Sequence, residues 1–529
     1  MSKVSKKLSV TGRTNSLSKN NEDIDSSAIK WSVLVAGMLS ILATVIFDKS
    51  QTLSGMSVAV FGLIAIICYA AYLAVNKKLT TQKMIFLLFA AGFIMRLDYV
   101  LYTPLSAETR IRQHDLYGFG GDKGHSAYIE FFYNNGFTLP DFDPTTKAQF
   151  YHPPLHHFLA ALWMRLLTTF GMSYDRAIGS IQFLTLFYST CCMFVSERIF
   201  GKLNMRGYGK VLAVAIVAFH PTFIILAGSV NNDILSVLFI LLSLYTTICW
   251  YKEPTVKNIL MIALSIGLGM STKLSVALVA PAVAVVFLIK FVTEKKKMFE
   301  HFGQFCIFGC VCLPLGLWFS VRNYIKFKVD FNFVPRLADT SDQYIGFRSV
   351  YERLLDYSYH PFDTVFLNRV STGSDYFEYN PFVSVIKSSM FGEYNFADTY
   401  QGITPFCKIL LVLNVLLIAA SIVAMVYCLI KKNDFMDRTM KIFFGFYQIL
   451  LFVNFVIFSF QYPHTCSMDY RYIVPTCVIG AMFIGMTVGK LQADHPKGST
   501  AVKVITYSLS GVIALFCLFS VFVFILLGV

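Results

Sequence analysis

Charged residues are scarce in this sequence, and their scarcity excludes most soluble folds. Only 14% of its 529 residues are Asp, Glu, Lys or Arg, whereas 56% are hydrophobic, and the mean hydropathy is +0.59. Stretches of about 20 apolar residues recur along most of the chain, and each is long enough to cross a bilayer core of about 30 Å. The composition therefore predicts an all-α polytopic membrane protein.

Paired cysteines, a phosphate-binding loop and a cleavable signal are also missing. The 12 cysteines show no zinc or thioredoxin spacing, and many lie inside apolar runs, where a thiol behaves as a small hydrophobe. The glycines at 118–121 are not followed by Gly-Lys-Ser/Thr, as a P-loop requires. Residues 1–30 are polar and basic and lack an early apolar core. We therefore expect no cofactor, no metal site and no disulfide framework, and a cytoplasmic tail at 1–30.

The positive charge of the chain is distributed in the way that membrane topology requires. The formal net charge is +14, and Lys residues concentrate in short loops at 76–78, 294–297 and 431–432. Short cytoplasmic loops of membrane proteins carry such an excess of Lys and Arg. This distribution argues against a nucleic-acid partner.

Thirteen apolar segments are candidates for transmembrane helices. They are 31–47, 56–75, 84–102, 178–200, 211–227, 234–250, 259–270, 274–292, 302–321, 406–430, 442–460, 472–488 and 502–527. With the basic tail inside, alternation places the Lys-rich loops inside as well. It places two long polar segments outside, at 103–177 and about 322–405, together with the short loops 229–233 and 461–471.

This topology depends on residues 154–170, which we interpret as a helix at the membrane interface that does not cross. Pro153 and Pro154 favour a helix start at this point, since proline fits the first turn. If the segment crossed, the later Lys clusters would move outside, and twelve or fourteen spans are the alternatives. The expected divisions are a tail (1–30), two additional spans (31–75), a core with the first outer loop (84–324), a second outer loop (325–405) and C-terminal spans (406–529).

Ionisable residues gather in the segments that this topology places outside. Such groups at the end of a membrane span are costly unless they face a partner or a cavity, so a dense set suggests a reaction site. A carboxylate beside cations at a water–lipid boundary can act as a general base while the cations hold an anionic leaving group. The pattern points to a lipid-linked phosphate as substrate. The candidate residues are Arg112, His114, Asp115, His125, His152, Asp233, Lys273, Glu393 and Arg471.

Several of these residues also have another interpretation. Lys273 and Arg471 can extend their charged ends to the interface, as cations at span ends usually do. Asp233 follows two asparagines and can cap the next helix, and Asp115 can form a salt bridge with its neighbours. His114, Asp115, Asp122 and His125 can be interpreted as metal ligands, although their spacing matches no strong ligand motif.

The order of motifs resembles a known family. An outer loop with Asp115 is followed by Gly-His-Ser-Ala-Tyr-Ile at 124–129, by the segment QFYHPPLHHFLAALW at 149–163 and by a span end GLGMSTKLS at 267–275. This order is similar to that of the GT-C membrane glycosyltransferases, in the branch of the protein O-mannosyltransferases and the lipid A aminoarabinose transferase. The resemblance is good over about 84–292 and general in the later spans.

The resemblance implies a GT-C-type helical bundle and an inverting transfer of a sugar from a polyprenyl- or dolichyl-phosphate donor. It places Asp115 where the family has its first-loop acid, and Asp233 where related enzymes have a second acidic residue. The mannosyltransferase pattern has paired Asp-Glu in the first loop, whereas Leu116 follows Asp115 here. A partner from elsewhere, such as Glu393, is then required. Two spans precede the helix that corresponds to the family's first.

Our hypothesis is a membrane glycosyltransferase at the outer face, in a bacterial plasma membrane or, in a eukaryote, the endoplasmic reticulum. Asp115 is the base, and protein, lipid or glycan is the acceptor. The donor phosphate is assigned to Arg112, His114, His152, Lys273 and Arg471, and the sugar or acceptor to His125, Asp233 and Glu393. The alternatives are an oligosaccharide ligase or polymerase, a transporter or flippase, which would favour internal repeats and charges near the midplane, and a structural membrane protein.

Overall fold

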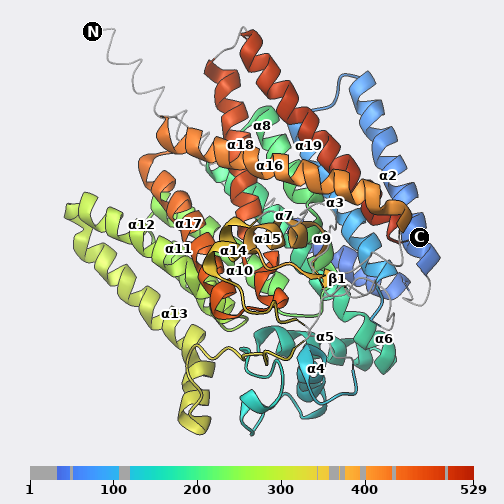
Figure 1. Ribbon diagram of the computed structural model, residues 1–529. Coiled ribbons are helices and arrows are strands. Elements are labelled where there is room, and N and C mark those ends of the chain that lie inside the picture. Colours follow the sequence, from blue (N-terminus) through green and yellow to red (C-terminus); the bar gives the residue numbers. More distant parts are fainter. Residues whose placement is uncertain are drawn as a thin grey trace.

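The computed structural model describes residues 32–47, 52–105, 119–341, 343–356, 368–369, 376–392, 401–431, 436–494 and 499–528. Its described part is helical apart from one pair of two-residue antiparallel strands, β1 (Asn368–Arg369) and β2 (Tyr376–Phe377). The helices pack into one bundle, with α4, α5 and α6 gathered at one end (Figure 1). We call this end the α5 end.

The long helices correspond to the apolar segments of the sequence. They are α2 (Thr52–Val75), α3 (Thr81–Tyr102), α7 (Ile181–Lys202), α8 (Gly207–Phe219), α9 (Pro221–Ala227), α10 (Asp233–Lys252), α11 (Val256–Met270), α12 (Ala280–Thr293), α13 (Met298–Phe327), α16 (Thr404–Ile430), α17 (Arg438–Gln461), α18 (Pro475–Asp494) and α19 (Thr500–Leu526). The short elements are α4 (Gly124–Asn134), η1 (Pro144–Thr146), α5 (Leu155–Thr169), α6 (Tyr174–Gly179), η2 (Leu274–Val279), η3 (Lys295–Lys297), α14 (Val350–Leu355), α15 (Pro381–Phe391), η4 (Gln401–Ile403), η5 (Thr465–Met468) and η6 (Tyr470–Tyr472).

The prediction of an all-α polytopic membrane protein is confirmed. Within the described residues, ten helical segments are long and apolar enough to cross a membrane, and a bent pair, α8 and α9, makes up to eleven. Two shorter apolar helices, Ser32–Ile46 and α11, fall on the two remaining predicted spans. Every predicted span therefore coincides with a helix, but two of these helices are shorter than a bilayer core requires.

A buried arginine binds the free carbonyl groups at the bend between α8 and α9. Pro221 has no N–H and bends the pair by 45°, which leaves carbonyl oxygens at the end of α8 without a helical partner. Arg96 of α3 is fully buried, and its guanidinium donates to Ala218 O at 2.6 Å and to Val217 O at 3.1 Å. Backbone groups at membrane depth must be satisfied within the protein. Arg96 therefore makes a sharp bend tolerable inside the bundle.

Helix α5 lies at the edge of the bundle and is two-sided. Its buried side carries His156, His157 and Met164; Met164 lies in a small separate core with residues of α4, and His157 contacts His125 of α4. Its other side exposes Leu162 and Leu166. The helix begins directly after Pro154, as the double proline predicts. It is 15 residues long and is not among the helices apolar enough to cross. These properties agree with the interpretation of α5 as an interfacial helix.

Candidate functional site

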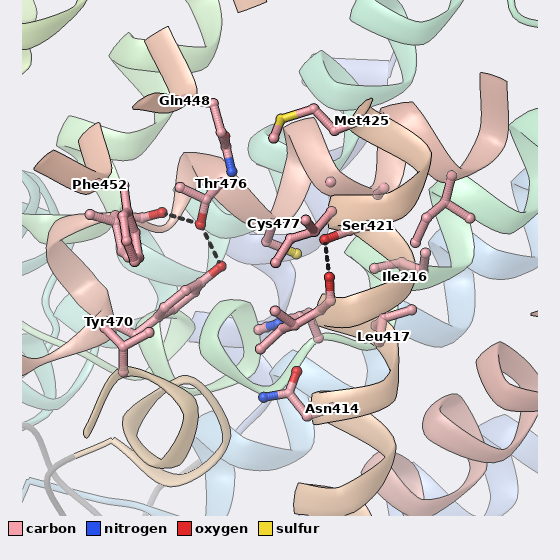
Figure 2. A pocket seen from close by; sticks show the side chains of 18 of the residues that line it. Ile216, Asn414, Leu417, Ser421, Met425, Gln448, Phe452, Tyr470, Thr476 and Cys477 are labelled. Carbon is pink, nitrogen blue, oxygen red and sulfur yellow. Dashed lines mark hydrogen bonds between the residues drawn. The ribbon is translucent and has the colours of Figure 1, made fainter. Parts of the chain in front are cut away.

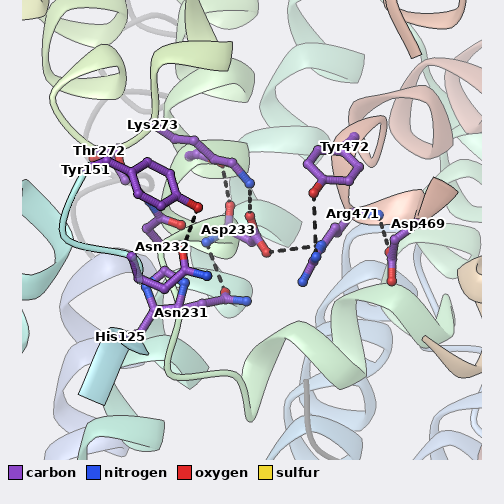
Figure 3. A network of polar contacts seen from close by, with 12 residues as sticks. His125, Tyr151, Asn231, Asn232, Asp233, Thr272, Lys273, Asp469, Arg471 and Tyr472 are labelled. Atoms are coloured by element: carbon purple, nitrogen blue, oxygen red, sulfur yellow. Dashed lines mark hydrogen bonds and ion pairs between the residues drawn. The ribbon is translucent and has the colours of Figure 1, made fainter. Parts of the chain in front are cut away.

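A buried carboxylate with two cations lies at the α5 end of the bundle. Asp233 is the first residue of α10, and its Oδ1 forms an ion pair with Lys273 Nζ. Its second oxygen lies 4.0 Å from Arg471 Nε (Figure 3). The three side chains are only 4%, 14% and 6% exposed. We call Asp233, Lys273 and Arg471 the charged cluster.

Backbone contacts bring the first two members of the cluster together. Asn232, just before α10, donates from Nδ2 to Thr272 O at 2.8 Å, and Asn231 Oδ1 accepts from the Asp233 N–H at 3.1 Å. Helix α11 ends at Met270, and Lys273 follows in an extended conformation, with its Nζ 5.0 Å from the ring centroid of Tyr472. The loop before α10 and the turn after α11 therefore form one rigid unit.

The third member comes from the turn before α18, which rests on the buried helix α15. Ser388 Oγ accepts a hydrogen bond from the Tyr470 N–H at 2.9 Å, and Ser384 Oγ donates to Met468 O at 3.0 Å. Asp469 caps the short helix η6 by accepting from the Arg471 N–H at 2.7 Å. The position of Arg471 is thus set by α15, an element that our sequence-based hypothesis did not connect with the site.

The two cations of the cluster are held in fixed orientations. Asp233 contacts both, and the Arg471 guanidinium also donates to Tyr472 Oη at 3.5 Å. Asp233 neutralises one of the two positive charges and orients both groups. A pair of oriented cations whose summed charge exceeds that of the carboxylate between them is an arrangement that can bind an anion such as a phosphate.

Four histidines pack beside the charged cluster. His125 Nδ1 and His157 Nε2 lie 2.8 Å apart, and the rings of His125 and His152 stack with centroids 5.6 Å apart. His156 Nε2 lies 2.7 Å from Val230 O, in the loop that leads to Asp233. The start of α5 is also linked to the other side of the cluster, because the Leu155 N–H donates to Ser271 O at 3.0 Å.

These imidazoles are neutral at pH 7. Burial, with a further contribution from the charges of Lys273 and Arg471, lowers the pKa of His152 to about 3. Burial likewise lowers the pKa of His156 to about 4 and holds the pKa values of His125 and His157 well below the usual range. In the pair of His125 and His157 one nitrogen donates and the other accepts, as neutral tautomers allow. The group therefore offers hydrogen bonds and ring surfaces and no positive charge.

The structure brings together five of the nine candidate residues, namely His125, His152, Asp233, Lys273 and Arg471. The other four, Arg112, His114, Asp115 and Glu393, lie outside the described residues, and so does the proposed base. Within the described parts of the chain, no three His, Cys, Asp or Glu side chains are arranged to hold a metal ion.

Glu130 of α4 is a further residue that the sequence alone did not indicate. Its Oε2 accepts from the Gly120 N–H at 2.7 Å and its Oε1 accepts from Tyr174 Oη at 2.5 Å. Gly120 lies two residues after the stretch that contains Asp115. Glu130 therefore anchors the backbone at Gly120 to α4, and only its position in the second turn of the helix that follows Gly120 could have indicated this role.

One protein-family model matches part of the chain. Residues 151–318 match the model of the dolichyl-phosphate-mannose-protein mannosyltransferases. This region contains His152, Asp233 and Lys273 but not Arg471. No curated protein matches the chain.

Solved structures of membrane transferases are similar in a general way. An oligosaccharyltransferase of Archaeoglobus fulgidus, tethered to an acceptor peptide, has a TM-score of 0.45 at 12% identity, covering 85% of this chain and 55% of the archaeal one. ArnT of Cupriavidus metallidurans in the apo state has a TM-score of 0.45 at 12% identity, covering 84% and 76%. The chain thus spans about half the length of the archaeal enzyme. The match of residues 151–318 to the mannosyltransferase model bears out the resemblance to the GT-C membrane glycosyltransferases.

Proposed function

We propose that this protein transfers a sugar from a polyprenyl- or dolichyl-phosphate carrier to an acceptor at the outer face of the membrane. The observation that supports the proposal most strongly is the charged cluster, because it presents two oriented cations at the end of an apolar bundle. In a site shielded from water, such cations stabilise the negative charge that develops on a leaving phosphate.

The proposed mechanism assigns one role to each group. Lys273 and Arg471 hold the phosphate of the donor, and Asp233 keeps both cations in place. Asp115 takes the proton from the acceptor hydroxyl or amine as that group attacks the anomeric carbon from the side opposite the phosphate. The configuration of the sugar is therefore inverted. The neutral rings of His125 and His152 contact the sugar and orient the reacting groups.

The direct test is turnover of defined donors by the purified protein. The protein is incubated with a panel of polyprenyl-phosphate sugars, and release of the lipid phosphate is measured. Asp115→Asn is expected to lower the rate by about 10²- to 10⁴-fold, the usual contribution of a general base. Asp122→Asn, a matched change in the same polar region, is expected to retain activity. Full activity of a folded Asp115→Asn protein contradicts the assignment of the base, and no turnover of any donor contradicts the function.

A further inference from the structure

A cavity lies between α16, α17 and α18, beside the charged cluster but separate from it. Its volume is about 350 Å³, within the range of small-molecule sites. Most of its lining is apolar, with Leu417 and Met425 from α16, Phe452 from α17 and Cys477 from α18 (Figure 2). The lining contains no Lys, Arg, Asp or Glu.

The cavity extends over about half the thickness of a membrane. Along α18 it reaches from Thr476, one residue after the helix start, to Ile484. At 1.5 Å per residue this is about 12 Å, compared with about 30 Å for the whole hydrocarbon core. Its depth therefore matches one leaflet, on the side where the charged cluster lies.

One side of the cavity opens laterally between α16 and α17. Three of its lining residues, Ile422, Ile449 and Val453, are 52%, 57% and 48% exposed, whereas Leu417 and Ala481 at its back are buried. An exposed apolar opening at this depth faces lipid chains in a membrane. A hydrocarbon chain can therefore enter from the side, without passing through water.

The end of the cavity near the cluster is polar but carries no fixed charge. Tyr470 Oη and Thr476 Oγ1 lie 2.9 Å apart, and the ring of His220 stacks on Tyr470 with centroids 5.8 Å apart. Asn414 lines the same region and donates from Nδ2 to Ser389 Oγ at 2.9 Å. Hydroxyl, amide and imidazole groups suit an uncharged hydroxyl-bearing head group better than a phosphate, which selects cations.

The short helix η6 separates this cavity from the charged cluster. Tyr470 faces the cavity, whereas the next residue, Arg471, faces Asp233 (Figures 2 and 3). A head group at Tyr470 would thus lie next to a phosphate at Arg471. We propose that the cavity binds an acyl chain of an uncharged, hydroxyl-bearing membrane lipid, and that this lipid is the acceptor of the sugar.

The proposal rests on the function proposed above and names its acceptor. The lipid hydroxyl oxygen forms a bond to the anomeric carbon of the sugar, and the bond from that carbon to the phosphate oxygen breaks. The hydroxyl proton goes to the base, and the polyprenyl phosphate leaves with the electron pair. The donor phosphate occupies the cation side of η6, so the two lipids approach from different sides of the same turn.

The test is photolabelling of the full-length protein in lipid nanodiscs, without any donor. The probe is a diacylglycerol with a diazirine in one acyl chain, and labelled peptides are identified by mass spectrometry. We expect labels on α16, α17 and α18. Ile422→Trp and Val453→Trp, which place a large ring at the exposed opening, should lower labelling about tenfold, equivalent to about 1.4 kcal/mol of binding.

A matched control lies on the same helix. Val423 is 69% exposed and does not line the cavity, so Val423→Trp should leave labelling unchanged. Equal labelling in Ile422→Trp and Val423→Trp overturns the proposal. Displacement of the label by a polyprenyl phosphate, but not by excess diacylglycerol, also overturns it, because the cavity then holds the donor chain.

Failure of this proposal is distinguishable from failure of the glycosyltransferase function. Labelling needs no sugar donor. Release of the lipid phosphate needs a donor but no particular acceptor, provided that water slowly reacts in place of the acceptor. Donor turnover without labelling of α16, α17 or α18 refutes the acceptor site alone. Labelling without turnover of any donor refutes the proposed acceptor role, because the bound lipid then receives no sugar.

Discussion

Removing Lys273 from the charged cluster is expected to destabilise the protein strongly. In Lys273→Met the carboxylate of Asp233 stays almost fully buried, with Arg471 at 4.0 Å as its remaining cation. Breaking a buried pair by removing one partner costs about 3–5 kcal/mol, because the other charge remains uncompensated. We expect a loss near the lower value, since Arg471 compensates in part. Thermal unfolding in detergent measures the change.

A double-mutant cycle with Asp233→Asn separates the ion pair from other effects of the substitutions. If the pair is the cause, the double variant loses less stability than the two single variants added together, with a coupling of about 0.5–3 kcal/mol. The control is the ion pair of Lys326 and Asp141, whose side chains are 48% and 82% exposed. Lys326→Met should cost about 0–1 kcal/mol. Additive effects at Lys273 and Asp233, or equal losses at Lys273 and Lys326, would refute the reasoning.

Three further predictions concern other parts of the molecule. Arg96→Lys keeps the charge but loses the planar fork that reaches Val217 O and Ala218 O, and should lower the unfolding free energy by about 1–3 kcal/mol, measured by thermal unfolding. Below pH 6.5 the unfolded chain takes up protons that His156, with a folded pKa of about 4, does not, so His156 should contribute a fall in stability of about 1.4 kcal/mol per pH unit between pH 6.5 and 4, in addition to the fall from the other three histidines. A flat profile in acid titrations, or the same slope in His156→Gln, would contradict this. Glu130→Gln weakens the anchor of Gly120 and should increase protease cleavage near Gly120, measured by limited proteolysis, without a large change in melting temperature.

The sequence predicted the spans well because the apolar runs have the length that a bilayer demands. Each predicted span coincides with a helix, including the stretch 211–227, which the structure divides at Pro221 into α8 and α9. The length of the apolar runs could not show that Arg96 binds the free carbonyl groups at the bend between α8 and α9. A count of apolar residues accepts one arginine inside a 22-residue helix as part of a span. The carbonyl group that Arg96 binds lies in another helix, so the sequence of α3 does not reveal it.

The candidate site was predictable in location but not in its contacts. Charge alternation brought Asp233, Lys273 and Arg471 to one end, and the structure places them in contact. Asp233 contacts both cations because Asn231 and Asn232 position it and because α15 positions Arg471. The sequence does not reveal these contacts, because hydrogen bonds such as that of Ser388 with the backbone of Tyr470 arise only from tertiary packing. The neutral state of the histidines likewise depends on burial, which residue type alone does not determine.

The charged cluster also has a consequence for biosynthesis. Asp233 and Lys273 lie forty residues apart, at the start of α10 and just after the end of the neighbouring helix α11, so they can meet while the chain is still emerging from the ribosome. Arg471 is translated much later, after helices α12 to α17. The early pair shields a carboxylate that would otherwise oppose insertion, and the last cation is added when α18 docks. A nascent chain stopped before residue 471 would therefore be inserted with the buried pair formed but without the second cation of the cluster.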